Sequence, residues 1–162
     1  MSSRKKCAFC DSCDLQLIID FGEVALAGAF ISKDEIKSEL KYPQELYFCN
    51  ECCAVQIIEK IPPTVLFKDY FYFSSAIKTL REHFSEYATE MVNRFSEGED
   101  FSVLEFGCND GVLLKPFVDL GVSRVIGVDP AKNVVDTIDE DRIIVINDFF
   151  NQETSNLVRE EY

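Results

Sequence analysis

Two pairs of cysteines near the N-terminus have the spacing of a metal site. Cys7 and Cys10 form one CxxC pair, and Cys49 and Cys52 form a second. Each pair offers two thiolates from one tight turn, a knuckle, and two knuckles supply the tetrahedral set of four sulfurs that zinc accepts. Because four protein ligands leave no open coordination position for water, the sequence predicts a structural rather than a catalytic Zn2+.

The other cysteines leave the choice of ligands open. Cys13 repeats the two-residue spacing after Cys10, and Cys53 adjoins Cys52, so either thiol could replace a ligand. The alternative interpretation is that these thiols are redox-active or simply buried. Cys108 lies far along the chain in a glycine-containing turn, where we expect a small turn residue. The odd total of 7 cysteines fits a disulfide framework badly.

A second group of residues has the pattern of a nucleotide-type binding turn. Residues 105–111, Glu-Phe-Gly-Cys-Asn-Asp-Gly, follow an apolar strand and open a helix, where backbone amides can meet a ligand. A nicotinamide fingerprint needs glycine at its first, third and sixth positions. Counting from Gly107 places Asn109 and Val112 at the last two. A nicotinamide-dependent enzyme is therefore the less favoured alternative.

Acidic residues around this turn favour a different adenosyl ligand. Asp129 ends the next strand, at the spacing from Gly107 where a carboxylate can accept hydrogen bonds from ribose hydroxyls. Glu105 and Asp110 make the turn acidic, which suits a ligand with an ammonium and a sulfonium better than one with phosphates. These properties describe S-adenosylmethionine (SAM).

Residues after the third expected strand could complete this site. Asp148 could reach the adenine amino group and Phe149 could stack on the base, although an ordinary loop acid is an equal alternative for Asp148. The candidate cofactor-binding residues are Glu105, Gly107, Cys108, Asn109, Asp110, Gly111, Asp129, Asp148 and Phe149.

The elements that position these residues divide the chain into three expected parts: a zinc-binding module at 1–60, a connecting helical segment at 61–98 and a partial sheet domain at 99–162. In the first part we expect a short helix at 33–40, capped by Ser32. Short strands are expected there at 15–19, 46–48 and 54–58.

The connecting segment carries a long amphipathic helix that begins at Ile77, with Ser74 or Ser75 as its cap. His83, the only histidine, lies on this helix. An imidazole titrates near neutral pH and could act as a general base, but a packed helix histidine is the favoured interpretation. The apolar stripe expected to face a core comprises Ile77, Leu80, Phe84, Tyr87, Met91 and Phe95.

The last part alternates strand and helix, which is typical of parallel α/β structure. Helices are expected at 112–120, where Pro116 could introduce a kink, then after Pro130 and at the end of the chain. Three strands make only about half of a usual doubly wound sheet, so we expect a truncated Rossmann-like core. The strands are expected at 102–106, 124–128 and 142–146.

Composition limits the partners of the chain. The 162 residues are 47% hydrophobic and carry a formal charge of −13, which disfavours nucleic acid and anionic membranes. No apolar run of about 18 residues is present, and the N-terminus lacks a secretory segment. We therefore expect a soluble, cytoplasmic protein with a small-molecule substrate.

Together these features resemble the zinc-containing, SAM-dependent sugar C-methyltransferases, which modify nucleotide-linked keto-deoxysugars in bacteria. The resemblance runs from Cys7 to about Phe150, although residues 21–27 differ from the family's proline-containing version of that stretch. It rests on both knuckles, Tyr42-Pro43, Val55-Gln56, residues 66–72 (Leu-Phe-Lys-Asp-Tyr-Phe-Tyr), His83, residues 105–111 and Asp129-Pro130.

The resemblance implies an activity and further site residues. A base removes a proton beside a ketone, and the enolate attacks the methyl group of SAM; in the family this base, usually a histidine, comes later than position 162. Tyr70 and Tyr72 match a tyrosine-rich loop of the sugar pocket, with an aromatic core as the even alternative. These two tyrosines and His83 are the candidate catalytic residues.

A hypothesis from a different class remains open. Without further strands, the strand at 102–106 would expose apolar surface and unpaired amides, which is a template for association. The chain would then be a zinc-stapled binding module without turnover by itself, which self-associates through this sheet edge.

Overall fold

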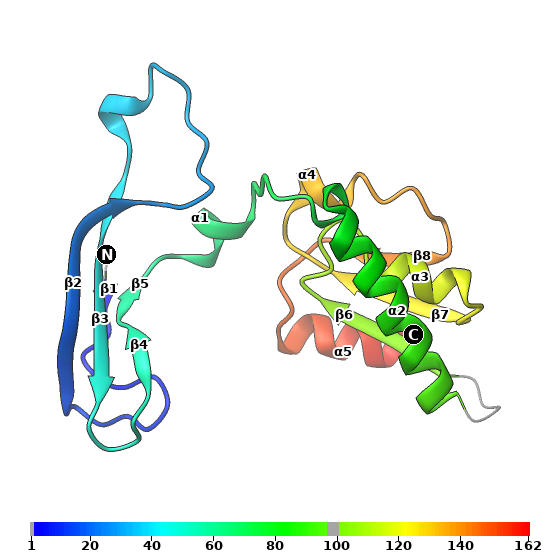
Figure 1. Ribbon diagram of the computed structural model, residues 1–162, viewed down its shortest axis with the longest axis horizontal. Coiled ribbons are helices and arrows are strands. Elements are labelled where there is room, and N and C mark those ends of the chain that lie inside the picture. Colours follow the sequence, from blue (N-terminus) through cyan, green and yellow to red (C-terminus); the bar gives the residue numbers. More distant parts are fainter. Residues whose placement is uncertain (1, 97–100) are drawn as a thin grey trace. The chain divides into compact units, whose positions relative to one another are not determined.

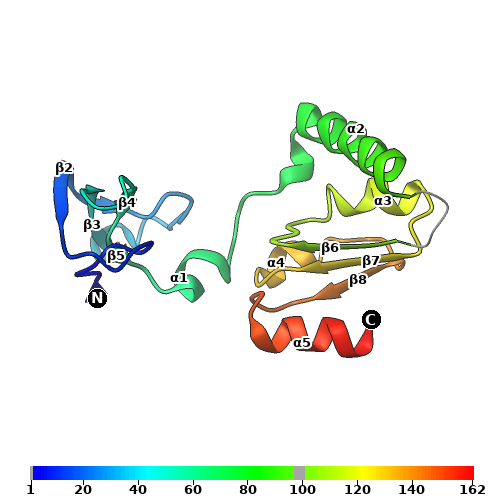
Figure 2. The same ribbon diagram turned by 90° about the horizontal axis from the view of Figure 1, so that it is seen from below.

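Two runs of strand-forming sequence give two separate sheets, and each sheet belongs to its own unit of the chain. The computed structural model describes residues 2–96 and 101–162 (Figures 1 and 2). Unit 1 comprises Met1–Leu66, and unit 2 comprises Phe67–Tyr162. The predicted boundary between residues 98 and 99 lies outside the described residues. The fold is a mixture of α and β structure, as the sequence predicts.

Unit 1 is built on an antiparallel sheet of three strands in the order β2-β3-β4 (Figure 1). A second, two-stranded ladder joins the start of the unit to its end, because β1 pairs with β5. The strands are β1 (Ser2–Ser3), β2 (Leu15–Ala25), β3 (Lys41–Cys49), β4 (Val55–Ile57) and β5 (Glu59–Lys60).

The strands β2 and β3 are both longer than the sequence pattern predicts. The expected strands at 15–19 and 46–48 form only parts of them. The β2–β3 register shifts between Leu17 and Ile19 and again between Asp20 and Glu23. Such bulges break the alternation of apolar and polar residues, so the pattern does not reveal the full length of β2.

The expected helix at 33–40 is wrong. Only one short 3-10 turn, η1 (Ile36–Ser38), forms there. The side chain of Glu35 accepts hydrogen bonds from both the backbone N–H and the hydroxyl of Ser32, at 2.8 and 2.7 Å. Ile36 and Leu40 are exposed, so a helix here would bury no apolar face. A helix of this length is marginal without such packing.

Unit 2 is built on a parallel sheet of three strands in the order β6-β7-β8. The strands β6 (Ser102–Phe106) and β7 (Arg124–Val128) have the predicted bounds, and β8 (Ile143–Ile146) begins one residue later than predicted. Phe106 pairs with Val128, which pairs with Ile146. The carboxyl ends of all three strands therefore meet at one edge of the sheet.

Helices cover the two faces of this sheet (Figure 2). The helices α2 and α3 lie on one face, and α5 lies on the other. No helix in the described part of the chain is long and apolar enough to cross a membrane. The helices of the chain are α1 (Pro63–Phe67), α2 (Lys78–Phe95), α3 (Leu114–Asp119), α4 (Lys132–Val135) and α5 (Gln152–Glu161).

The long helix α2 begins one residue later than predicted, and only Leu80, Phe84 and Met91 of the predicted stripe are half-buried. Its cap is Ile77, which makes no side-chain capping bond, so the expected serine cap is wrong. Ser74 and Ser75 lie instead in a short 3-10 helix, η2 (Ser74–Ala76). Tyr87 and Phe95 of the predicted stripe are exposed. The helix contacts the core through Ala88, Met91 and Val92.

The core of unit 2 lies between the helices α2 and α3 and the sheet. Pro116 is accommodated because it is the third residue of α3, where a backbone N–H has no intrahelical partner. The buried residues of the main cluster are Ala88, Cys108, Leu114, Phe117, Val118, Val125, Val135 and Ile143.

Candidate functional site

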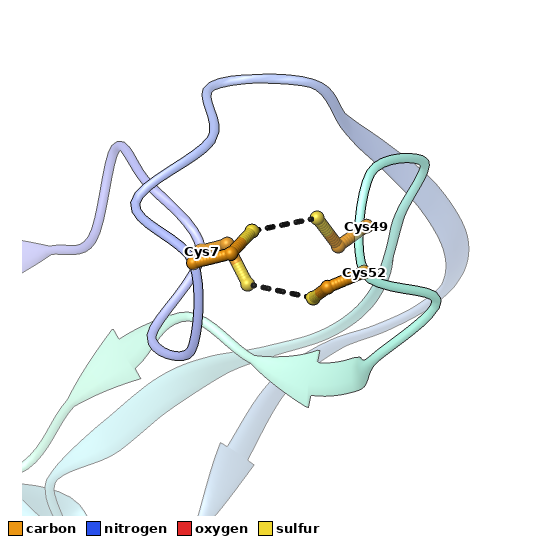
Figure 3. A group of neighbouring side chains, drawn as sticks. Cys7, Cys49 and Cys52 are labelled. Atoms are coloured by element: carbon orange, nitrogen blue, oxygen red, sulfur yellow. Dashed lines mark hydrogen bonds between the residues drawn. The ribbon is translucent and has the colours of Figure 1, made fainter.

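The four predicted zinc ligands lie together in unit 1. The sulfur atoms of Cys7, Cys10, Cys49 and Cys52 all lie within 4.8 Å of one another. The sulfur atoms of Cys7 and Cys52 are 3.6 Å apart, as are those of Cys10 and Cys49. Figure 3 labels Cys7, Cys49 and Cys52 of this cluster. The hairpin β2–β3 brings the two knuckles together, because Leu15 at the start of β2 pairs with Cys49 at the end of β3.

The two knuckles share one backbone pattern. The residue four positions after the first cysteine of each knuckle has a left-handed conformation: Asp11 has φ 59° and Cys53 has φ 61°. Each donates its N–H to the carbonyl of that first cysteine, at 3.2 Å for Asp11 and 2.9 Å for Cys53. Cys53 therefore closes a turn, in the position that Asp11 holds in the first knuckle. Cys13 and Cys53 are exposed and lie outside the sulfur cluster.

A glutamine that the cysteine spacing does not reveal supports the cluster. Gln56 on β4 is buried, and its amide donates to the sulfur of Cys7 at 3.0 Å while its carbonyl accepts from the N–H of Ala8 at 2.8 Å. The sequence marks this residue as a polar position within the apolar strand β4 and as part of the Val55-Gln56 pair of the resemblance, but neither signal gives its contact with Cys7. Gln56 orients a ligand as outer-shell residues of metal sites do.

The electrostatics of the cluster suit a cation. Desolvation alone would raise the pKa of the Cys7 thiol, but hydrogen bonds from the N–H of Phe9 and from Gln56 lower it to about 6. The pKa of Cys10 is lowered by a hydrogen bond from the backbone of Ser12. Desolvation and the three other thiols outweigh this bond and raise the pKa of Cys10 to about 12. Four thiols this close resist joint ionisation, and a divalent metal ion offsets their repulsion.

The glycine turn joins β6 to α3 in unit 2. Three of its residues have left-handed backbones: Gly107 with φ 79°, Asn109 with φ 50° and Gly111 with φ 73°. Asparagine tolerates this conformation better than most residues, so Asn109 can adopt a left-handed backbone without being a glycine. The N–H of Gly107 donates to the carbonyl of Val128 at 2.7 Å, which ties the turn to the end of β7.

Asp129 holds the turn from the next strand. Asp129 is buried, with only 8% of the residue exposed. One oxygen of its carboxylate accepts from the N–H of Asn109 at 2.9 Å, and the other accepts from the N–H of Ala131 at 2.8 Å. Each carboxylate oxygen keeps a second acceptor position. Asn147, which the sequence pattern does not single out, donates to the backbone carbonyl of Asp129 at 2.9 Å.

The two residues expected near adenine lie after β8, at the same edge of the sheet. Asp148 is exposed, and its side chain accepts from the N–H of Phe149 at 2.7 Å. Phe149 is half-buried. The ring that stacks at this edge is Phe150, whose centroid lies 4.9 Å from that of Phe106.

Negative charge concentrates beneath the turn. Burial, with Asp129 and Asp110 nearby, raises the pKa of Glu105 to about 7. Its buried Oε2 has no hydrogen-bond partner among the described residues. Cys108 lies in the hydrophobic core. Burial, together with the nearby carboxylates of Asp129, Glu105 and Asp110, raises the pKa of its thiol to about 12. A cation would be favoured next to these carboxylates, and a phosphate would be repelled.

The structure brings two of the three candidate catalytic residues to the turn. Asn109 donates to the backbone carbonyl of Tyr72 at 2.9 Å, and the rings of Tyr70 and Tyr72 meet edge to face at 6.4 Å. His83 is exposed on α2, with its ring 5.5 Å from that of Phe84 and 6.5 Å from that of Tyr87. These contacts are those of a histidine packed on its own helix.

Comparison with known proteins supports the zinc site. Residues 7–67 match a family model described as "Putative zinc binding domain" (Methyltransf_13). The matched segment contains all four clustered cysteines. No curated protein matches the chain. The match and the sulfur cluster together show a zinc-binding, methyltransferase-related N-terminal part.

The choice of ligands can be tested by substitution. We expect Cys49→Ser to lower bound zinc from one per chain to near none, because the buried sulfur of Cys49 is one of the four. Loss of a structural zinc removes folding free energy on the order of 10 kcal/mol. Metal content by mass spectrometry and thermal unfolding check this. The matched controls Cys13→Ser and Cys53→Ser should keep zinc, and zinc loss in either would reassign a ligand.

The buried carboxyl of Glu105 predicts a pH-dependent stability. Its folded pKa of about 7 lies above the ordinary value of 4.5, so its favourable contribution is full below 4.5 and is lost as pH rises through 7. We expect Glu105→Gln to stabilise the fold by about 1 to 3 kcal/mol at pH 8 and by nothing near pH 4. Chemical denaturation measures this. Exposed Glu86→Gln is the control, and equal effects in both variants would contradict the prediction.

Proposed function

We propose that the chain is the N-terminal portion of a SAM-dependent C-methyltransferase whose substrate is a nucleotide-linked keto-deoxysugar. In this proposal residues 101–162 are part of a Rossmann-like core that holds SAM. The match of residues 7–67 to a methyltransferase-related zinc domain and the parallel sheet of unit 2 both support it. The nucleotide sugar follows from the family resemblance described above.

The acidic turn at the carboxyl edge of the sheet is the observation on which this proposal rests. Ligands of open parallel sheets bind outside the carboxyl ends of the strands. A side-chain carbon added at Gly107 would meet nothing within 4 Å, so the backbone is open to close approach there. Asp129 lies beside this opening with acceptor capacity left for ribose hydroxyls.

The residues present fit SAM better than a phosphate-bearing cofactor. The unpartnered buried oxygen of Glu105, together with Asp110 and Asp129, suits the ammonium and sulfonium of SAM. A pyrophosphate would meet repulsion from the same carboxylates. When bound, SAM supplies an electrophilic methyl group. The chain's own residues hold it: the open turn approaches it, and Asp129 orients its ribose.

The acceptor side of the site would be formed by the tyrosines next to the turn. Tyr72 is held by Asn109, and Tyr70 packs against Tyr72, so both can line a pocket beside the methyl group. His83 packs against rings of its own helix, an arrangement that does not favour it as the base. We place the base that forms the enolate outside these 162 residues. The zinc is proposed to be structural, because four thiolates complete its coordination.

Cofactor binding can be tested with two glycine variants. Gly107 and Gly121 both have positive φ, 79° and 86°, and an added side-chain carbon meets nothing at either position. Alanine therefore costs about 1 to 2 kcal/mol of backbone strain at each. We expect only Gly107→Ala to weaken SAM binding, by more than about tenfold, because only Gly107 lies in the turn.

Calorimetry with SAM measures this effect, with Gly121→Ala as the matched control. A methyl-transfer assay on keto-deoxysugar nucleotides complements it, and we expect binding without turnover by the 162 residues alone. Wild-type protein that does not bind SAM, or a Gly107→Ala variant that binds it normally, would refute the proposed cofactor site.

A second candidate function is assembly through the edge of the parallel sheet. The strand β6 has a partner on one side only in the described part of the chain. Two of its apolar side chains, Leu104 and Phe106, are 38% and 65% exposed. An exposed apolar edge of this kind is a template for pairing with another chain.

Sedimentation velocity tests this candidate. If β6 is an interface, wild-type protein self-associates, and Leu104→Lys lowers the association at least about tenfold because a lysine at a paired edge must be desolvated. The control is Leu157→Lys, at a leucine of similar exposure, 36%, on α5. A monomeric wild-type protein would leave the methyltransferase proposal as the only one.

A further inference from the structure

The segment before α2 is bound to the rest of unit 2 by side chains of the glycine turn and of α4. We call residues 70–75 the aromatic strap. Its first residue is held by Asn133 on α4: the amide oxygen accepts from the N–H of Tyr70 at 3.1 Å, and the amide nitrogen donates to the carbonyl of Tyr70 at 2.7 Å. One asparagine thus binds both polar backbone groups of a single strap residue.

The second half of the strap is bound in the same way by the glycine turn. The amide of Asn109 donates to the carbonyl of Tyr72 at 2.9 Å and accepts from the N–H of Ser74 at 3.0 Å. The carboxylate of Asp110 accepts from the N–H of Ser75 at 2.9 Å. Ser74 and Ser75 begin η2, and the first N–H groups of a helix have no intrahelical partner, so these side chains supply one. Three side chains thus determine the course of the strap.

These bonds place the two tyrosine rings beside the cofactor turn. Tyr70 is half-buried and also lies 6.2 Å from the ring of Phe67, whereas Tyr72 is half-exposed. The backbone of Tyr70 is fixed by Asn133, and that of Tyr72 is fixed by Asn109. Loss of either amide would free one of the two rings that meet edge to face.

Asn109 is bound directly to Asp129, whereas Asn133 lies two residues after Ala131, which is bound to Asp129. The backbone N–H of Asn109 donates to one oxygen of the Asp129 carboxylate, while the Asn109 side chain donates to the carbonyl of Tyr72 in the strap. The other oxygen accepts from Ala131, which directly precedes α4 and therefore Asn133. A ligand that contacts Asp129 and the turn thus touches the support of both ends of the strap.

We propose that Asn133 and Asn109 are positioning residues that hold Tyr70 and Tyr72 at the acceptor side of the site and couple their position to the occupancy of the cofactor turn. This inference rests on the proposed function. If an ordered strap binds the ligand more tightly than a disordered strap, then the bound ligand shifts the strap toward its ordered state. The factor is the same in both directions, because coupling between two sites is reciprocal.

Amide hydrogen exchange of individual strap residues tests the positioning role. Asn133→Ala removes both bonds to Tyr70, and we expect exchange of the Tyr70 N–H to accelerate at least about tenfold while Ser74 changes little. Asn109→Gly keeps the left-handed backbone of the turn and should accelerate Ser74 instead. The control is Asn93→Ala, an exposed asparagine on α2. Unchanged exchange in both variants would overturn the role.

Exchange and calorimetry with SAM test the coupling. In the wild-type protein SAM should slow exchange of the Tyr70 and Ser74 amides, and Asn133→Ala should weaken SAM binding by at least about fivefold although Asn133 is not a proposed SAM contact. Asn93→Ala should bind SAM as the wild type does. The coupling would be overturned if SAM bound without changing the exchange of the strap amides, or if Asn133→Ala bound SAM with the affinity of the wild type. The proposed function would stand in either case.

Failure of the proposed function gives a different result. A wild-type protein that does not bind SAM overturns both the proposed function and the coupling. The positioning role of the two asparagines is then decided by the exchange of Tyr70 and Ser74 in the free protein alone.

Discussion

The carboxylate of Asp129 is the interaction on which the arrangement of unit 2 depends. Asp129 directly follows β7, and its carboxylate accepts hydrogen bonds from the N–H of Asn109 in the glycine turn and from the N–H of Ala131 before α4. Two loops that leave neighbouring strands are thereby joined through one buried side chain. Asn109 binds the strap at Tyr72, and Asn133 on α4 binds it at Tyr70. The positions of the two tyrosines therefore also depend on this carboxylate.

Unit 1 depends on a different kind of constraint. Its buried residues, where the structure describes side chains, are only Cys7, Tyr42, Cys49 and Gln56, whereas many apolar side chains of β2 are exposed. A unit with so small a core gains little from hydrophobic burial, and small domains of this kind commonly need a metal or disulfides. Two of the four buried residues belong to the cysteine cluster that could hold a metal, and a third is hydrogen-bonded to one of them, so the buried part of this unit is centred on the sulfur cluster.

Local patterns predicted the parts of the structure in which burial and periodicity agree. Strands β6 and β7 are short apolar runs between turn residues, and their bounds were predicted from the sequence. The helix expected at 33–40 failed because periodicity says nothing about whether a face is buried. The contacts of Gln56 and Asn133 could not be predicted, since their partners lie 49 and 63 residues away and only the folded chain brings them together.

The charge of the turn distinguishes between ligands that its glycine pattern leaves unresolved. Asn109 adopts a left-handed backbone as a glycine would, so the absence of glycine at position 109 does not by itself exclude a dinucleotide. A buried carboxyl without a partner is costly, and Glu105 reduces that cost by a raised pKa. A cation beside it would restore the ionised form, whereas a pyrophosphate would oppose it. The acids around the turn, rather than its glycines, therefore favour a sulfonium ligand.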